Sequence, residues 1–148
     1  MNDNLTNAQR LLQLFDQMRD KRLGTTFQRL SELNLSFSHV RALRLLAVAH
    51  TMPMKDLAEQ LALTPPSVTA LTRRLVQTDL IRRESHANDS RVALLSLTSA
   101  GEALLHEISR DQLNQMEKLL HGLSAEEQNL LLNLLERAVR AMRALPDA

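Results

Sequence analysis

The residues with the clearest chemical potential are three arginines around a short polar segment. Arg82 and Arg83 come just before the run HANDS, and Arg91 follows it. Residues 80–85 and 91–97 have the composition of short strands, so they predict a two-stranded ribbon with the arginines near its turn. Guanidinium groups pair well with phosphate. The predicted chemistry is contact with a nucleic acid.

A compact pair of helices is predicted directly before this ribbon. Residues 54–61 have the pattern of a short helix, and residues 65–78 that of a second, which Thr64 and a proline at the first helical position begin. This pair alone fits an ordinary packing of two helices as well as a helix-turn-helix. The ribbon that follows favours a winged helix-turn-helix. The apolar side of the second helix is predicted to consist of Val68, Leu71, Leu75 and Val76.

Leucine-rich helices are predicted on both sides of this region. Residues 6–33 predict one helix with a bend at Gly24, residues 99–121 a second, and a capping box of Ser124 and Glu127 begins the last. The apolar arc of the last helix is too wide for a half-exposed surface helix, so we expect a second copy to cover it. A buried helix in a monomer is the alternative, but the chain has few elements to surround it. The expected dimer contacts are Leu11, Leu14, Leu131, Leu135 and Met142.

Composition excludes several classes of site. The 148 residues carry a formal net charge of +1, so any nucleic-acid contact must come from local charge, and no cysteine is present for disulfides, thiolate zinc sites or thiol redox sensing. The five histidines are scattered, and Arg110 stands where a zincin-like motif beginning at His106 needs its second histidine. We therefore expect no metal and no cofactor. No signal peptide or membrane span is indicated, which predicts a cytoplasmic protein without a membrane partner.

Residues 35–101 resemble the MarR family of bacterial winged-helix transcription regulators. The resemblance rests on DLAEQL, LTPPSVTALTRRL, LIRRE, DSR and LTSAG in that order. Its most specific part is DSR followed by LTSAG, at the spacing of the family's D-x-R…LT-x-x-G wing. Where the family commonly has glycine before the first wing strand, this chain has Asp79, which tolerates left-handed backbone, so we expect the turn to survive.

The resemblance implies a mostly α fold with a small two-stranded β wing. It implies one domain over residues 1–148, with a winged helix-turn-helix at 36–98 and helical dimerisation parts at 1–34 and 99–148. The implied function is that of a homodimeric regulator, in the first instance a repressor, bound to a pseudo-palindromic site in double-stranded DNA. An enzyme is not indicated, because no set of catalytic residues assembles. A winged helix that serves only as a protein-binding scaffold is the alternative.

The predicted DNA contacts lie on the second helix of the pair, on the ribbon and at the start of the helix before the pair. Arg73 faces the major groove, Arg74 lies at the margin of that face where phosphate is near, and the resemblance places Arg91 in the minor groove. Asp89 would orient Arg91 or cap the loop. Capping is also an alternative role for Ser36. The full predicted set is Ser36, Ser38, Thr64, Pro66, Ser67, Thr69, Arg73, Arg74, Arg83 and Arg91.

Arg82 and Arg83 have two possible roles on the ribbon. They can reach flanking phosphates, or they can form surface ion pairs with Glu84 or Asp79. For Arg83 we favour the DNA role, because it matches a recurrent arginine of the family.

Family members often respond to small anionic or aromatic effectors. Phe15, Met18 and Phe37 could line a pocket for such a molecule, although apolar residues at helical spacing are more often core residues. No residue set in the sequence identifies the ligand.

Overall fold

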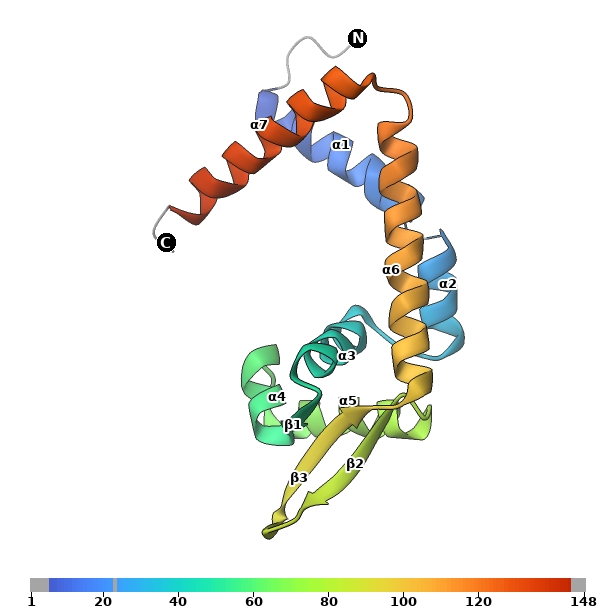
Figure 1. Ribbon diagram of the computed structural model, residues 1–148, viewed down its shortest axis with the longest axis vertical. Coiled ribbons are helices and arrows are strands. Elements are labelled where there is room, and N and C mark those ends of the chain that lie inside the picture. The colour runs from blue at the N-terminus through green and yellow to red at the C-terminus, as the bar shows by residue number, and fades with distance from the viewer. Residues whose placement is uncertain (1–5, 23, 145–148) are drawn as a thin grey trace. The chain divides into compact units, whose positions relative to one another are not determined.

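The computed structural model describes residues 6–22 and 24–144, so the ends of the predicted dimerisation parts and residue 23 lie outside it. Its elements in chain order are α1 (Asn7–Arg22), α2 (Gly24–Glu32), α3 (Phe37–Ala49), β1 (Thr51–Pro53), α4 (Met54–Leu61), α5 (Pro65–Gln77), β2 (Ile81–His86), β3 (Asp89–Leu97), α6 (Ser99–Leu120) and α7 (Ala125–Arg143) (Figure 1). The predicted class, mostly helical with a small antiparallel sheet, is confirmed.

The N-terminal helical region differs from the prediction of one bent helix. It forms two helices, and Gly24 is the first residue of α2. Glycine disfavours a helix interior because its backbone loses more entropy on ordering than that of other residues. At a helix start this cost is smaller, which is consistent with the division at this point.

The sheet has three strands rather than the predicted two. Its order is β1-β3-β2, and all pairings are antiparallel. Strand β1 pairs Thr51 with Ser96 and Pro53 with Leu94. Three residues are too few for a strand periodicity, and proline is tolerated only on an edge strand such as this one. Strand β1 therefore exists through its pairing with β3 and has no signal of its own in the sequence.

The core joins α3, α4 and α5 to the sheet. Leu43 and Leu46 of α3, Leu57 of α4, Leu75 of α5 and Leu95 of β3 are completely inaccessible to solvent. Burying a leucine side chain contributes about 1.5–3 kcal/mol relative to leaving it exposed. These side chains hold the two helices of the helix-turn-helix against the base of the ribbon.

The buried side of α5 follows the prediction with one exception. Val68, Leu71 and Leu75 are buried, but Val76 is 42% exposed and does not belong to the core. Thr72 is buried in addition, and its hydroxyl donates to the Val68 carbonyl at 2.8 Å. That internal hydrogen bond removes the cost of burying the hydroxyl.

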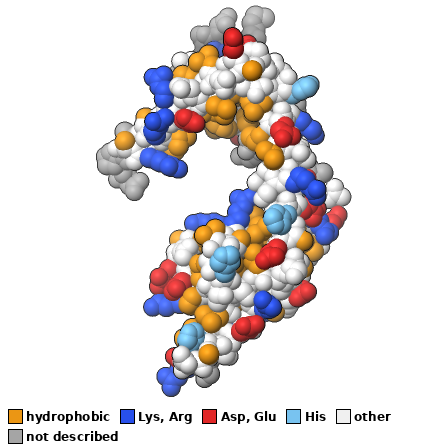
Figure 2. All heavy atoms as spheres, in the orientation of Figure 1, with side chains coloured by type: hydrophobic (Ala, Val, Ile, Leu, Met, Phe, Trp, Pro, Cys, Tyr) orange, Lys and Arg blue, Asp and Glu red, His pale blue; other side chains and the backbone are white. Residues whose placement is uncertain are grey.

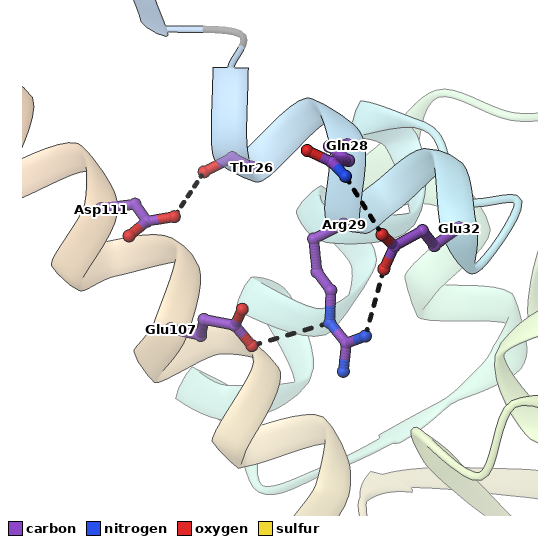
Figure 3. A network of polar contacts seen from close by, with 6 residues as sticks. All are labelled: Thr26, Gln28, Arg29, Glu32, Glu107 and Asp111. Carbon is purple, nitrogen blue, oxygen red and sulfur yellow. Dashed lines mark hydrogen bonds and ion pairs between the residues drawn. The ribbon is translucent and has the colours of Figure 1, made fainter.

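Polar contacts fasten α2 to α6 (Figure 3). Arg29 Nε lies 3.8 Å from Glu107 Oε2, and the buried Thr26 donates from its hydroxyl to Asp111 Oδ2 at 3.4 Å. Arg29 also lies 3.4 Å from Glu32, within α2. The contacts join segments about 80 residues apart, since Thr26 and Asp111 are separated by 85 positions.

The chain divides into two compact units, residues 1–111 and 112–148. The second unit contains the end of α6 and all of α7. The capping box predicted for α7 is confirmed: the Ser124 N–H donates to Glu127 Oε2 at 2.8 Å, and the Glu127 N–H donates to Ser124 Oγ at 3.2 Å. No residue of α7 is buried within this chain.

Candidate nucleic-acid interface

Helix α5 begins with an exposed and well-capped N-terminus. Thr64 Oγ1 accepts the Ser67 N–H at 3.4 Å, and the two hydroxyl oxygens lie 2.9 Å apart. Pro65 occupies the first helical position, as predicted, and Pro66 and Ser67 are exposed. The amide N–H groups of a first helical turn lack intrahelical partners and favour an anion such as phosphate.

The outer face of α5 carries positive charge. Arg73 is exposed, and no acidic residue lies anywhere in the helix. Thr69 is partly exposed, and its hydroxyl donates to the Pro65 carbonyl at 2.8 Å, so its oxygen keeps only its acceptor capacity for a ligand. Arg73 therefore remains on this face as an exposed, positively charged hydrogen-bond donor.

Arg74 lies elsewhere than its neighbour. Its Nε and Nη2 both donate to the carbonyl oxygen of Leu33, at 3.1 and 2.5 Å, and the side chain is partly buried. Leu33 lies 41 positions before Arg74 in the sequence. The predicted place of Arg74 at the margin of the helix face did not indicate this contact.

The ribbon has a shorter turn than the predicted loop HANDS. Strands β2 and β3 extend to His86 and Asp89 and leave only two residues between them. Ser85 pairs with Ala93 but His86 pairs with Asp89, so residues 90–92 form an irregular bulge opposite a single step of β2. Bulges redirect side chains locally. In the space-filling view, a basic side chain projects at the end of the ribbon (Figure 2).

Arg91 lies in this bulge and is exposed. The Asp89 carboxylate accepts the backbone N–H of Arg91 at 3.0 Å. Of the two roles predicted for Asp89, this contact is the capping one. A carboxylate engaged with the backbone next to Arg91 stabilises the turn that carries the guanidinium.

Arg82 and Arg83 lie on opposite faces of β2, because side chains alternate along a strand. Arg82 pairs across from Ser96, contacts its hydroxyl at 3.4 Å and lies 4.0 Å from Glu84, so it forms the surface ion pair predicted as one alternative. Arg83 pairs across from Leu95 and is exposed. Its contact with DNA stays a prediction.

The start of α3 is a second polar cluster. The Ser36 N–H donates to His39 Nδ1 at 3.0 Å, and Ser36 Oγ lies 2.9 Å from the same nitrogen. Ser36 and His39 form the capping box of α3, which is the role given as the alternative for Ser36. Its contact with DNA stays a prediction, as does that of the exposed Ser38. Burial of the ring and, second, the Arg74 guanidinium hold the pKa of His39 below its ordinary value of 6.5. The partner His39 was missed, although S-x-x-H has the spacing of a capping box.

Ser36 and His39 also line a surface hollow of about 320 Å³ together with Ser31, Asn34 and Leu35. Phe37, next in sequence, is 58% exposed, and Phe15 and Met18 are also exposed or partly exposed. The core alternative for these three apolar residues does not hold within one chain. Their role in an effector pocket stays a prediction.

The expected dimer residues lie on the surface of the single chain. Leu11 and Leu14 on α1, and Leu135 and Met142 on α7, are exposed, and Leu131 is partly so. Exposed apolar side chains at this density are typical of an interaction surface.

Among the residues that the structure describes, no group of three histidine, aspartate or glutamate side chains could hold a metal ion. Within the same residues, no helix combines the length and the apolar character needed to cross a bilayer.

Comparisons with known proteins agree with this arrangement. Residues 35–93 match the sequence model of the MarR family. The chain is 34% identical over 116 residues to the HTH-type transcriptional regulator FarR of Neisseria gonorrhoeae, covering 78% of this chain and 80% of that protein. It is 29% identical over 106 residues to the homoprotocatechuate degradative operon repressor of Escherichia coli, covering 72% of each.

A mutant of MepR from S. aureus bound to an oligodeoxyribonucleotide has the same fold. Its TM-score is 0.74 at 23% identity, and the match covers 94% of this chain and 99% of that one. The fold, the wing and the sequence relatives all lead to one assignment. This chain belongs to the MarR family of transcription regulators, which bind DNA and are not enzymes.

Proposed function

We propose that the protein is a homodimeric repressor that binds a pseudo-palindromic site in double-stranded DNA. The observation that carries this proposal is the acid-free outer face of α5, with Arg73 exposed, on the helix that precedes the ribbon bearing Arg91. Two such helices in a two-fold dimer fit half-sites about one helical turn, or ~10 base pairs, apart. As a DNA-binding regulator of a bacterial family it would act in the cytoplasm, where the DNA is.

Two relatives support the finer parts of the proposal. The E. coli relative is named a repressor, and the MepR mutant was solved with an oligodeoxyribonucleotide. A second copy would cover the apolar residues of α7, none of which is buried in one chain. A small anionic or aromatic effector that releases the DNA belongs to the same proposal, with Phe15, Met18 and Phe37 as its pocket residues.

The proposal is tested by duplex binding across a salt series with two variants. If Arg73 contacts a base edge, Arg73→Ala should weaken the binding free energy for the preferred site by roughly 1–3 kcal/mol. The difference in affinity between the preferred site and a scrambled duplex should become smaller. If Arg91 enters the minor groove, Arg91→Ala should weaken binding to both duplexes. It should also make the slope of log affinity against log salt shallower by about two per dimer, one per phosphate neutralised.

The same measurement separates this function from a protein-binding scaffold. A scaffold would show no salt-dependent preference for any duplex selected from a random pool. An Arg91→Ala protein with unchanged affinity and unchanged slope would reduce the wing to a structural ribbon.

A further inference from the structure

Two neighbouring arginines of α5 have opposite surroundings. Arg73 is exposed, whereas Arg74 is partly buried and gives two N–H groups to one carbonyl oxygen, that of Leu33. The Nη2 to oxygen distance of 2.5 Å and the Nε distance of 3.1 Å make this a paired, charge-assisted contact. It is a specific contact between two elements.

The acceptor carbonyl lies at the C-terminal end of a helix, where a cation is favourable. Leu33 follows the last residue of α2, and the next residue, Asn34, has left-handed backbone with φ 52°. The Leu35 N–H closes the turn by donating to the Leu30 carbonyl at 2.8 Å. Carbonyls at a helix C-terminus lack intrahelical donors and carry partial negative charge, so a guanidinium there supplies both hydrogen bonds and opposite charge.

Helix α2 is itself fixed on another side. Arg29 and Thr26 connect it to Glu107 and Asp111 of α6 (Figure 3). Helix α6 begins where β3 ends, so its contacts with α2 connect α2 to the base of the wing. The contact of Arg74 with Leu33 connects the turn after α2 to the second half of α5. Within the first unit, α5 is held by this connection and by its buried side chains.

We propose that Arg74 is a positioning residue for DNA recognition: it holds the second half of α5 against the turn after α2 and does not neutralise a phosphate. A guanidinium that moved to DNA would leave the Leu33 carbonyl without its cation and its two donors. The proposal rests on the proposed function, because it takes α5 as the helix that enters DNA. It replaces the phosphate contact that the sequence predicted for Arg74.

The test compares Arg74→Ala with Arg91→Ala in the salt series on specific and scrambled duplexes. We expect Arg74→Ala to weaken binding to the specific duplex tenfold or more while its salt slope equals that of the unaltered protein. Arg91→Ala should have the shallower slope. A slope shallower by about two per dimer in Arg74→Ala would assign Arg74 to a phosphate and overturn the proposal. Unchanged affinity with unchanged slope would also overturn it.

A second measurement needs no DNA. The Arg74 guanidinium contributes to lowering the pKa of His39, so an NMR titration of His39 should show a higher pKa in Arg74→Ala. Arg73→Ala is the matched control, because it removes the same charge one residue away on the exposed face; it should leave the His39 pKa unchanged. Equal effects of both variants would contradict the placement of Arg74 at this turn. The titration gives a result even if the protein binds no duplex. Failure of the proposed function is therefore distinguished from failure of the Arg74 proposal.

If Arg74→Ala does not fold, Arg74→Lys answers the same question. Lysine keeps the charge but presents one nitrogen where arginine presents two. A phosphate contact would be largely retained, with near-normal affinity. A positioning contact would not, so we expect weaker specific binding at an unchanged salt slope.

Discussion

His39 shows how one side chain ties protonation to a helix start. Its Nδ1 can accept the Ser36 N–H only while that nitrogen carries no proton. Glutamate or glutamine is the usual residue at this position of a capping box. Histidine occupies that position here, and burial together with Arg74 favours its neutral form by lowering its pKa.

This arrangement predicts a pH dependence of stability. Because the pKa of His39 is lower in the folded chain than its ordinary 6.5, the unfolded chain binds the proton more readily. The free energy of unfolding should be fully supported above about pH 6.5 and should fall as the pH drops below that value. Denaturant unfolding at a series of pH values between 5 and 8 measures this.

His39→Gln is the control for that prediction. It keeps a side-chain acceptor at the usual capping-box position and removes the titration. The variant should lose less stability between pH 7.5 and pH 5.5 than the unaltered protein. Parallel pH profiles for the two proteins would exclude His39 as the source.

At the scale of elements, the junction of α5, β3 and α6 explains the LTSAG part of the wing motif. Thr98 donates from its hydroxyl to the Asp79 carbonyl and from its backbone to the Leu80 carbonyl. The same hydroxyl oxygen accepts the Gly101 N–H at 3.1 Å. Asp79 has the left-handed backbone expected of it, with φ 56°. One threonine therefore joins the end of α5 to the start of α6.

Position 101 requires glycine, because a side chain at the start of α6 would have no space. A Cβ at this position would lie 2.1 Å from the Leu80 carbonyl oxygen, a backbone atom that cannot move aside independently. We expect Gly101→Ala to destabilise the protein by roughly 1–3 kcal/mol or more, since α6 must shift away from the turn after α5. Denaturant midpoints measure the loss.

Gly122 provides the matched control. Nothing lies within 4 Å of a Cβ placed there, and no glycine in the described residues has positive φ. Gly122→Ala should therefore be neutral or stabilising by about 0.4–1 kcal/mol. A Gly101→Ala protein as stable as Gly122→Ala would show that α6 does not need the close approach.

At the scale of the whole molecule, the principal question is what covers α7. Met142 is 66% exposed and Leu135 is 42% exposed, seven positions apart on one stripe of a helix without a buried residue. The helix has a capping box at its N-terminus and a surface ion pair between Arg140 and Glu136 on its polar side. None of its apolar side chains is buried in the part of the chain that the structure describes.

We predict that charge on this stripe disrupts the proposed dimer. Leu135→Glu/Met142→Glu should give a monomer, or an unfolded chain, that binds duplex DNA weakly, because carboxylates cannot be buried at an apolar contact without a large cost. Asn129→Glu/Asn133→Glu adds the same charge to exposed positions on the other side of α7 and should remain dimeric. Sedimentation at micromolar concentration measures both; a stable monomer for the unaltered protein would contradict the proposal.

Sequence by itself determined the features whose causes lie within a few residues. The caps at Thr64 and Ser124 depend on side chains and backbone within three residues, so local patterns predict them. The left-handed backbone of Asp79 was expected from the family resemblance, which places a turn there. The buried side of α5 was predicted from a local pattern as well, apart from Val76, whose exposure depends on what packs beyond the helix.

Tertiary structure decided the features that join distant segments. Strand β1 is formed by three residues that have no strand signal until β3 lies beside them. Arg74 was predicted to lie at the margin of the outward face of its helix, near phosphate, and its guanidinium donates to the Leu33 carbonyl 41 positions away. A one-dimensional pattern gives the side of a helix on which a residue lies. The backbone oxygen that lies opposite that side depends on how the helices pack. Only packing brings a helix end with unpaired carbonyls within reach of a guanidinium.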